Sequence, residues 1–372
     1  MRILFVITGL GHGGAEKLLL TKCAHFHEKG FPVQVVCLTR RLGLLEDFQR
    51  MGIQVTCLDI SNTYTAFRAI NVYRKIVDEF RPSVIHAHML HANIFSRIAA
   101  IGCKKKYAII NTVHDTNNRK RFFLNSLYQL TNGKVDLVTA ISQEAYLNHI
   151  SNTKIPNGKI ICMANFVNND QFKQDNSIAV TYRSNLNLQE KFVWIAVGRF
   201  FPQKDYGNLL TAFRLLRSKY PQVVLLIVGN GPLEMEVNNM ILKNDLNNSV
   251  KMLGVRNDVS QLLNTADAYV MSSAWEGQPI ALIEAASTNL PIVATDVGGN
   301  NTIVVDGING YLVPPKNPQA LFEGMEKIVM MSKTDLIEMG KNSRKCVEKN
   351  FAVEDFGRKW LEIYNEKEKL YN

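Results

Sequence analysis

The sequence contains no run of about 18 consecutive apolar residues, the length that a helix needs to cross a membrane. The apolar run from Arg2 to Thr8 stops at Gly9, so it is too short for the core of a secretory signal and we expect a first buried strand there. The six cysteines are scattered without a C-x-x-C pair, which argues against a cysteine-based metal site and against a disulfide framework. These absences favour a cytoplasmic protein with reduced thiols.

The composition predicts a globular chain with an uneven distribution of charge. Hydrophobic residues make up 46% of the 372 residues and charged residues 20%, which excludes a disordered chain and suggests about two domains. Residues 1–175 contain 22 Lys and Arg against 12 Asp and Glu, whereas 176–372 contain 21 of each. The whole excess of +10 therefore belongs to the first half. No nucleic-acid-binding signature accompanies it, so we expect an anionic partner of another kind and no nucleic acid.

β-rich runs alternate with segments of helical periodicity through most of the chain, which predicts parallel sheets covered by helices. The runs are 2–8, 33–38, 53–58, 83–88, 107–113, 135–140, 192–198, 223–229, 249–254, 268–272 and 291–296. The Asn- and Gln-rich segment 168–190 has no strand run and reads as a linker. We expect an α/β protein with two Rossmann-like domains, 1–172 and 173–350, whose strand ends face a central cleft. The tail 351–372 is expected to be a helix that packs back on the first domain.

A glycine-rich loop, Gly9-Leu-Gly11-His-Gly13-Gly14, follows the first expected strand and opens a helix. Its G-x-G-x-x-G pattern lets the backbone approach a pyrophosphate at a helix N-terminus. The second strand ends Thr39-Arg40-Arg41 rather than on an acidic residue, so NAD is disfavoured and NADP stays open. A Walker loop is excluded, and a tight turn without a ligand is the other interpretation.

Two motifs in the second half also carry chemistry. Arg199 and Lys204 leave the first strand of that domain beside a helix start, where a guanidinium and an ammonium can form a diphosphate site. Glu276 stands in the loop before a helix that Pro279 is expected to open, and Glu284 lies inside that helix. Two carboxylates so placed can accept hydrogen bonds from sugar hydroxyls. Taken singly, Arg199, Lys204 and Glu284 have the alternative interpretation of solvated surface charges, and Glu276 that of a helix cap.

The order of these motifs along the chain resembles the family 4 retaining glycosyltransferases of the GT-B fold, from about residue 5 to about residue 315. The paired-glutamate segment is the most specific of them. The matching pieces are Gly13-Gly14-Ala-Glu16, Val113-His114-Asp115, Ala140-Ile-Ser142, Asn165, Gly198-Arg199 with Lys204, Val228-Gly229-Asn-Gly231-Pro232, Glu276-x7-Glu284, Asp296-Val-Gly-Gly299 and Asp306-Gly to Gly310.

The resemblance implies a nucleotide-sugar donor, held mainly by the second domain, and an acceptor held mainly by the first. Arg199 and Lys204 would hold the donor diphosphate, Glu276 the transferred sugar and Glu284 the ribose, with His114 near the reacting sugar. The expected catalytic set is Arg199, Lys204, Glu276 and His114. The expected donor-binding set is Gly13, Gly14, Arg199, Lys204, Gly229, Gly231, Val255, Glu276, Gly277, Gln278, Pro279, Ile280 and Glu284, and the expected acceptor or cleft set is His12, His88 and Asn165.

Two residues depart from the family pattern: Phe166 stands where a glycine is usual, and Gln278 where an apolar or aromatic residue is usual. The chain has no Asp-x-Asp motif, which suits a transferase that uses cations of the protein in place of a metal. His86, His88 and His91 cluster around a strand end with His114 further on, but their spacing lacks a zinc signature. We therefore expect neither a metal nor another cofactor.

Two basic clusters, Lys104–Lys106 and Arg119–Arg121, account for part of the first half's charge. The second precedes Phe122, Phe123, Leu124, Leu127 and Leu130, a pattern typical of an interfacial helix and equally of a surface helix that faces its core. We therefore expect a retaining transferase of a hexose or N-acetylhexosamine, with UDP as the default nucleotide. Its acceptor is expected to be a glycan, most plausibly linked to a polyprenyl diphosphate, at the inner face of an anionic membrane during surface-polysaccharide synthesis. The alternatives are a nucleotide-sugar epimerase of the same fold, an NADP-linked oxidoreductase and a non-enzymatic nucleotide-sugar binder.

Overall fold

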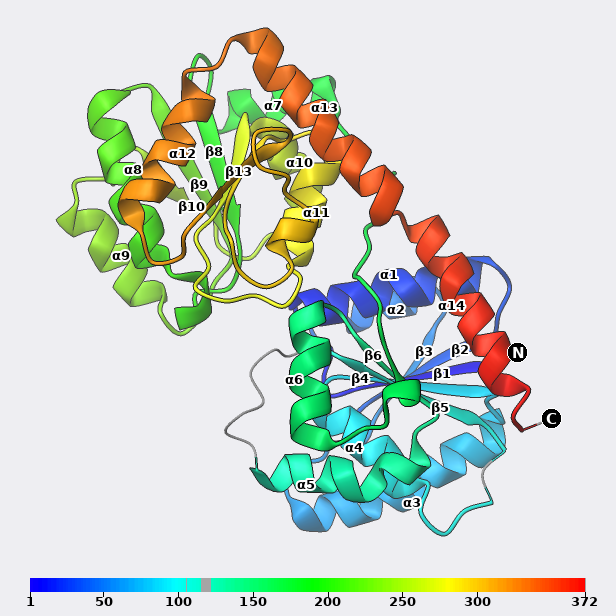
Figure 1. Ribbon diagram of the computed structural model, residues 1–372. Coiled ribbons are helices and arrows are strands. Elements are labelled where there is room, and N and C mark those ends of the chain that lie inside the picture. The colour runs from blue at the N-terminus through cyan, green and yellow to red at the C-terminus, as the bar shows by residue number, and fades with distance from the viewer. Residues whose placement is uncertain (105, 115–121, 372) are drawn as a thin grey trace. The chain divides into compact units, whose positions relative to one another are not determined.

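The computed structural model describes residues 1–104, 106–114 and 122–371, and the chain folds as two compact units (Figure 1). Unit 1 comprises Met1–Phe166 together with Val353–Asn372, and unit 2 comprises Val167–Ala352. The chain thus passes from unit 1 to unit 2 and returns, a few residues from the expected boundaries at 172 and 350. No helix of the described residues is long and apolar enough to cross a membrane.

Unit 1 is built on a seven-stranded parallel sheet of order β3-β2-β1-β4-β5-β6-β7. Every residue of β1, β4 and β5 is buried, because helices cover both faces of a parallel sheet and leave no solvent-facing side. The strands are β1 Ile3–Ile7, β2 Val33–Cys37, β3 Gln54–Cys57, β4 Val84–His88, β5 Ala108–Val113, β6 Leu137–Ala140 and β7 Ile160–Cys162.

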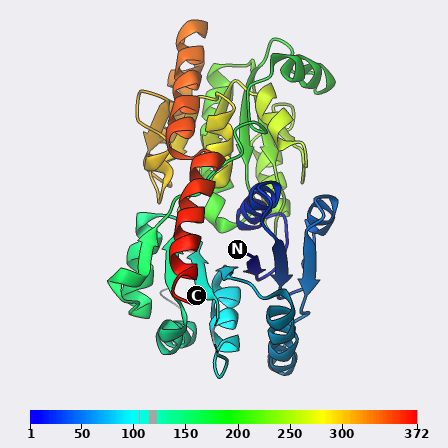
Figure 2. The same ribbon diagram turned by 90° about the vertical axis from the view of Figure 1, so that its right-hand side faces the viewer.

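The helices of unit 1 form a layer on each face of this sheet. One layer contains α1 packed against α14, and the other contains α4 packed against α3 on one side and α5 on the other (Figures 1 and 2). The helices are α1 Gly14–Glu28, α2 Leu45–Arg50, α3 Thr63–Phe80, α4 Leu90–Ala99, α5 Phe122–Thr131, α6 Gln143–Thr153 and α14 Val353–Glu368.

Unit 2 repeats the architecture with a six-stranded parallel sheet of order β10-β9-β8-β11-β12-β13. Its strands are β8 Phe192–Val197, β9 Val223–Val228, β10 Val250–Met252, β11 Ala268–Met271, β12 Ile292–Thr295 and β13 Gly310–Val313. Its helices are α7 Asn176–Asn185, α8 Tyr206–Lys219, α9 Glu234–Lys243, α10 Val259–Thr265, α11 Ile280–Ser287, α12 Pro318–Val329 and α13 Lys333–Asn350. The sheet and helices therefore confirm the two Rossmann-like folds expected from the alternation of strands and helices.

The segment 168–190, expected to be a linker, is instead a folded part of unit 2. Asp175 caps α7 by accepting hydrogen bonds from the backbone of Ser177 and Ile178. Arg183 of α7 forms a salt bridge with Asp267 and donates to the carbonyl of Thr265. The polar composition that suggested a linker thus reflects a capped surface helix, which has no strand pattern to reveal it.

Aromatic side chains hold α14 against unit 1. Phe166 stacks on Phe356 with ring centroids 3.7 Å apart, and Trp360 and Tyr364 continue the row along the helix. The Tyr364 hydroxyl lies 2.6 Å from Nδ1 of His86 in β4. Phe166, the departure from the family's usual glycine, is therefore a buried anchor of the C-terminal helix.

We expect Phe166→Ala to lower the free energy of unfolding by about 3–5 kcal/mol, because it removes a buried ring from this stack. Urea unfolding followed by circular dichroism measures the change. The control is Leu370→Ala, at an exposed side chain just beyond α14, which should shift stability by no more than about 0.5 kcal/mol. Equal effects of the two changes would show that the stack does not stabilise the unit.

Candidate functional site

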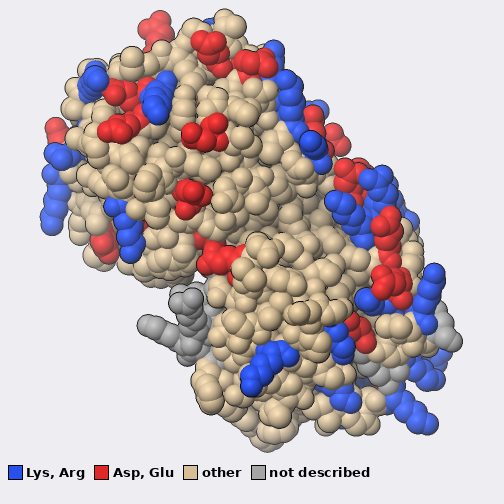
Figure 3. Space-filling view, in the orientation of Figure 1, with Lys and Arg blue, Asp and Glu red and all other residues tan. Residues whose placement is uncertain are grey.

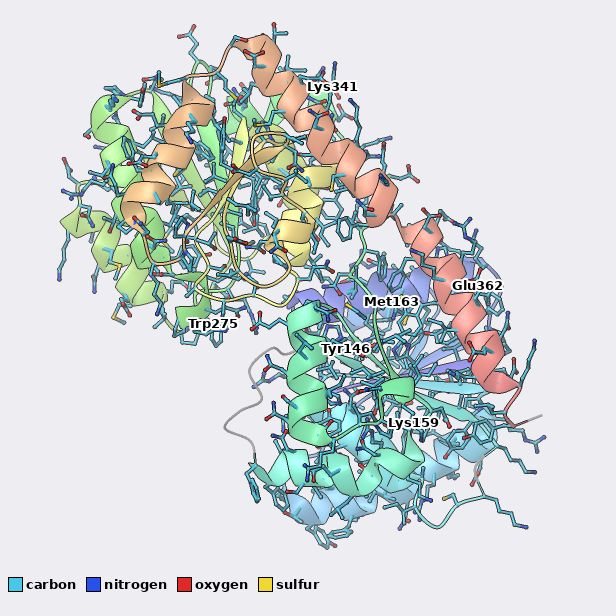
Figure 4. All side chains as sticks on the ribbon, in the orientation of Figure 1. Tyr146, Lys159, Met163, Trp275, Lys341 and Glu362 are labelled. Carbon is cyan, nitrogen blue, oxygen red and sulfur yellow. The ribbon has the colours of Figure 1, made fainter. Side chains whose placement is uncertain are left out.

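In unit 2 the expected donor-binding residues lie where strands of the parallel sheet end. The chain runs from β8 outward to β9 and β10 and then returns to β11 on the other side of β8, so the topological switch point lies between β8 and β11. Ligands of open α/β sheets bind at such points, at the carboxyl ends of the strands. Lys204 follows β8 and Glu276 follows β11, so the two lie on the two sides of the switch point. Trp275, beside Glu276, lies at the margin of unit 2 (Figure 4) and is 41% exposed.

A hydrogen-bond network centres on the buried Glu276 carboxylate. Its Oε1 accepts from Lys204 Nζ at 2.5 Å and from Ser273 Oγ at 2.7 Å, and its Oε2 accepts from Gln203 Nε2 at 3.0 Å. The side chains of Glu276 and Lys204 are 6% and 18% exposed. Both carboxylate oxygens are thus engaged, which fixes the orientation of the group and satisfies its charge away from water.

Backbone contacts join the two loops that carry this network. Ser272 Oγ donates to the carbonyl of Lys204 at 2.8 Å, and the Ala274 amide donates to the carbonyl of Gln203 at 2.8 Å. Asp205 has a left-handed backbone, with φ of 46°, and caps α8 by accepting from the Asn208 amide. The position of Lys204 is therefore set by its loop as well as by its ion pair.

Glycines allow the neighbouring loops to approach closely. Gly298 after β12 has a φ of 54°, and a Cβ there would collide with the carbonyl of Glu276. Gly229 and Gly231, expected in the donor set, lie after β9, where a Cβ on either would collide with the loop after β8. Close backbone packing is a sufficient reason for glycine at these positions.

The remaining donor-side residues are arranged around the same edge. Pro279 precedes α11 as its N-cap, and the helix begins at Ile280, so Gly277 and Gln278 lie directly before it. Gln278 is buried and donates to Thr302 Oγ1, and Glu284 is buried in α11. Arg199 is exposed, with its guanidinium 4.8 Å from the centre of the Phe201 ring, and Val255 is 46% exposed after β10.

In unit 1 the glycine-rich loop follows β1, beside the switch point between β1 and β4. Gly13 is the N-cap of α1 and Gly14 its first residue, so backbone amides face outward from the helix start. The carboxylate of Glu16 folds back over this start, since a Cβ on Gly13 would lie 2.5 Å from its Oε2. His12 is exposed and its ring lies against Gly43. An anion at this helix start would have to displace the Glu16 carboxylate.

Three histidines are close together at the carboxyl ends of β4 and β5. His88 Nδ1 lies 3.2 Å from His114 Nε2, and the rings of His86 and His88 stack with centroids 4.2 Å apart. His86 is engaged on both ring nitrogens, by Tyr364 and by Thr112. It therefore holds α14 in place, whereas His88 and His114 face each other. Asn165, the third expected cleft residue, is buried directly before Phe166.

Burial and a buried lysine keep these histidines neutral. Burial lowers the pKa of His88 well below its ordinary value, and His86 and Lys22 lower it further. The pKa of His114 falls to about 3 for the same two reasons, burial and then Lys22. Lys22 of α1 is itself buried, which lowers the pKa of its own amine well below the ordinary value, and its Nζ lies 4.0 Å from the centre of the Trp360 ring. The pair of His88 and His114 is therefore a hydrogen bond between neutral imidazoles at physiological pH.

Among residues 1–104, 106–114 and 122–371, no group of three or more His, Cys, Asp and Glu side chains is arranged to hold a metal ion. Arg40, one of the two arginines that kept NADP open, forms an exposed salt bridge with Asp59 at 2.9 Å. Asp115, next to His114 in the sequence, lies outside the described residues.

Two family models match the chain in succession. The model described as Glycosyltransferase Family 4 matches residues 12–171, and the model described as Glycosyl transferases group 1 matches residues 181–346. The chain belongs to the glycosyltransferase family that these two models describe. The two matches cover both units, so the family expected from the order of the motifs is confirmed.

Curated relatives and solved structures agree with this assignment. The chain is 24% identical over 371 residues to the UDP-Gal:alpha-D-GlcNAc-diphosphoundecaprenol alpha-1,3-galactosyltransferase of Escherichia coli, covering 91% of the chain and 90% of the relative. It is 24% identical to the phosphatidylinositol N-acetylglucosaminyltransferase GPI3 subunit of Saccharomyces cerevisiae, over 81% of the chain and 67% of that protein. The structure of Anabaena HepE in complex with UDP-glucose matches with a TM-score of 0.88 at 22% identity, over 98% of the chain and 100% of HepE. This glycosyltransferase therefore has the GT-B fold.

Sequence reasoning missed two residues that contact a predicted site residue of this glycosyltransferase, and a third that acts on two other predicted site residues through its charge. Gln203 and Ser273 hold the Glu276 carboxylate, and Lys22 lowers the pKa of His88 and His114. Gln203 and Ser273 flank residues that the motifs singled out, so adjacency was the available signal. Lys22 lies four residues after Leu18 and four before Phe26, so helical periodicity places it on the apolar stripe of α1, and this was the available signal for its burial.

Gln203→Glu should raise the pH at which activity is lost on the acidic side. It places a second carboxylate beside Glu276, and two neighbouring carboxylates resist simultaneous ionisation. Rate measurements over a pH series test this, with Gln203→Ala expected to lower activity by up to about tenfold and to move the acidic limb less, because it removes a donor without adding a charge. The control is Gln189→Glu at an exposed position of unit 2. An unshifted profile for Gln203→Glu would contradict the positioning role.

Acid should destabilise this glycosyltransferase because His88 and His114 are neutral when folded. Their folded pKa values lie below the ordinary 6.5, so their contribution to stability is fully present above about pH 6.5 and is lost as the pH falls toward 3. Each such histidine adds a slope of up to about 1.4 kcal/mol per pH unit.

Urea unfolding at several pH values measures that slope. His88→Gln should flatten it, because glutamine takes up no proton, whereas His27→Gln at an exposed position should not. Parallel curves for wild type and His88→Gln would refute the assignment.

Proposed function

We propose that this enzyme transfers a hexose or N-acetylhexosamine from a UDP-sugar to a hydroxyl group of a lipid-linked glycan, with retention of configuration and without a metal ion. The names of the relatives support the classes of donor and acceptor. The E. coli relative is named for UDP-Gal and a diphosphoundecaprenol acceptor, and HepE was solved with UDP-glucose. Such a reaction belongs to the synthesis of a surface polysaccharide or another glycoconjugate.

The observation that carries the proposal is the Lys204–Glu276 pair at the switch point of unit 2. Both side chains are largely buried and neutralise each other at 2.5 Å. A donor diphosphate would offer the Lys204 ammonium a second anionic partner. Glu276 would then have an oxygen available for hydroxyl groups of the transferred sugar. Donor binding would therefore give the Lys204 charge a new partner and would not leave an unpaired charge buried.

Catalysis in this proposal consists of positioning and electrostatic stabilisation. Arg199 and Lys204 would stabilise the negative charge of the departing diphosphate, together with the N-terminus of α8, and would stand in for a divalent cation. Glu276 is held by three donors and would orient the sugar rather than attack it. The leaving phosphate oxygen would help to deprotonate the acceptor hydroxyl, so that no protein nucleophile is required. Glu284 would bind the ribose.

Unit 1 would supply the acceptor side. His12, His88 and Asn165 are the residues proposed for the acceptor. Gly13 and Gly14 would instead approach the donor diphosphate through their backbone amides, and His114 would accept or donate a hydrogen bond near the reacting sugar as a neutral imidazole. A lipid-linked acceptor places the reaction at a membrane, and the positive charge of the first half suits an anionic one.

The alternatives predict different behaviour. A nucleotide-sugar epimerase of the same fold would release UDP without dependence on an acceptor, and a non-enzymatic binder would hold the donor without turnover. An NADP-linked oxidoreductase is disfavoured, because Arg40 is engaged with Asp59 and the chain belongs to a transferase family.

Lys204→Ala and Glu276→Ala should each lower sugar transfer by roughly a hundredfold to a thousandfold, since each removes a charge that acts on the transition state. The assay first screens a panel of sugar nucleotides for slow nucleotide release, which identifies the donor without the acceptor, and then measures transfer. Circular dichroism verifies that the variants are folded.

Lys219→Ala and Glu323→Ala, at exposed positions of unit 2, serve as matched controls and should retain full activity. Transfer should persist in EDTA, and the product should keep the anomeric configuration of the donor by NMR. Near-normal turnover in Lys204→Ala would refute the proposed role, and loss of activity in EDTA would refute the metal-independent mechanism.

A further inference from the structure

Exposed aromatic side chains are concentrated on two helices of unit 1. Among the described residues, all four aromatic side chains that are more than half exposed lie on α3 and α5. Val72 on α3 and Leu130 on α5 are also more than half exposed. We call these six residues the α3–α5 surface: Tyr64 at 69%, Phe67 at 69%, Val72 at 51%, Phe122 at 86%, Phe123 at 72% and Leu130 at 82% exposed.

The core of unit 1 does not account for this exposure. α3 already packs a separate face on the sheet, formed by Ala69, Tyr73, Val77 and Phe80. α5 likewise buries Asn125, Tyr128 and Thr131. The alternative that the α5 stripe is an ordinary core-facing pattern is therefore wrong for Phe122, Phe123 and Leu130. Apolar side chains left in solvent on two helices of one layer indicate an interaction site.

The two helices belong to one layer on one face of the sheet. α4 packs against both α3 and α5, and Figures 1 and 2 show the three helices in a row. In a parallel sheet every crossover helix begins at the carboxyl edge, so the first turns that carry Tyr64, Phe67, Phe122 and Phe123 lie toward that edge. His88 and His114 lie at the same edge of the same sheet. The aromatic end of this surface therefore borders the proposed acceptor side of unit 1.

The charge of unit 1 indicates what covers this surface. Unit 1 has 25 Lys and Arg against 15 Asp and Glu, whereas unit 2 has 18 of each. The chain from Leu90 to Thr131 has seven Lys and Arg and one Asp, although Arg97, one of the seven, is buried. On the face drawn in Figure 3, most Lys and Arg of unit 1 lie toward its right and lower right, whereas both signs of charge are mixed over unit 2.

Basic side chains also lie on or near the α3–α5 surface itself. Arg68 is exposed, with its guanidinium 5.9 Å from the centre of the Tyr64 ring. Lys75 of α3 is exposed and forms a salt bridge with Glu79 at 3.7 Å, and Lys104 and Lys106 are exposed beyond the end of α4, toward the amino edge of the sheet and away from the aromatic end of the surface. Lys105 and Arg119–Arg121, the rest of the two expected basic clusters, lie outside the described residues.

We propose that the α3–α5 surface is where this enzyme docks on an anionic lipid bilayer. Exposed aromatic rings favour the interfacial region of a bilayer, and basic side chains nearby are attracted to anionic head groups. This inference rests on the proposed lipid-linked acceptor, because docking through this surface brings the acceptor side of unit 1 to the membrane. A second copy of the chain would instead have to bring together two units that each carry an excess of ten positive charges.

Vesicle flotation of the full-length enzyme tests the proposal. Wild type should float with phosphatidylglycerol-containing vesicles, and binding should weaken in high salt and with pure phosphatidylcholine vesicles. The double variants Tyr64→Ser/Phe67→Ser and Phe122→Ser/Phe123→Ser should each lower the partition coefficient by about tenfold or more, because each withdraws two rings from the bilayer. The matched control, Met235→Ser/Leu242→Ser, changes two exposed apolar residues of unit 2 and should bind as wild type does.

Activity on two acceptors separates this inference from the proposed function. The surface variants should lose transfer to a lipid-linked acceptor in vesicles but keep nucleotide release and transfer to a short soluble analogue. Failure of wild type to float, or equal flotation of wild type and both surface variants, would overturn the docking surface while leaving the proposed function standing. Normal flotation without transfer to any acceptor would overturn the proposed function instead. A dimer in light scattering that the surface variants abolish, without vesicle binding, would identify the surface as a self-association interface and refute membrane docking.

Discussion

The ion pair between Lys204 and Glu276 is the interaction around which the loops of the candidate site in unit 2 are arranged. A lysine and a glutamate that are both largely removed from water are stable only when paired and hydrogen-bonded, and here Ser273 and Gln203 complete the set. The pair can form at 2.5 Å only if the loops after β8 and β11 lie side by side. Three features place them so: the parallel pairing of those strands, the contacts of Ser272, and the glycine at 298, which lets the backbone approach Glu276 closely.

Unit 1 meets a different constraint, since the described charged or titratable groups that act on His88 and His114 are a lysine and histidines rather than carboxylates. Burial and the presence of Lys22 keep His88 and His114 neutral, and the rings of α14 cover Lys22. The C-terminal helix is therefore part of the electrostatics of the first unit, although it follows unit 2 in the chain. Phe166 secures this arrangement where the first unit ends.

The division of charge between the units follows the proposed division of labour. Unit 2 is neutral overall, and its few site cations have specific partners, which suits a small anionic donor. Unit 1 carries the excess of ten and the exposed aromatic rings, which suit an extended anionic surface. In the proposed function, each unit would bind its ligand at a switch point and a helix start, and the two ligands would differ because the surrounding side chains differ.

The amino-acid sequence by itself determined the two Rossmann-like folds, because fully buried parallel strands must be continuous apolar runs and the helices between them must be amphipathic. It also placed Arg199, Lys204 and Glu276 in loops that follow strands, because the end of a strand and the turn after it are marked by local features of the sequence. The sequence wrongly indicated a linker at 168–190, because the surface helix α7 in that segment, held by Asp175 and Arg183, has little hydrophobic periodicity of its own. The partners of Glu276, the covering of Lys22 by Trp360 and the exposure of Phe122 depend on residues far apart in the chain. Only the tertiary structure decided those features, because contacts between distant segments are set by strand order and packing rather than by any local pattern.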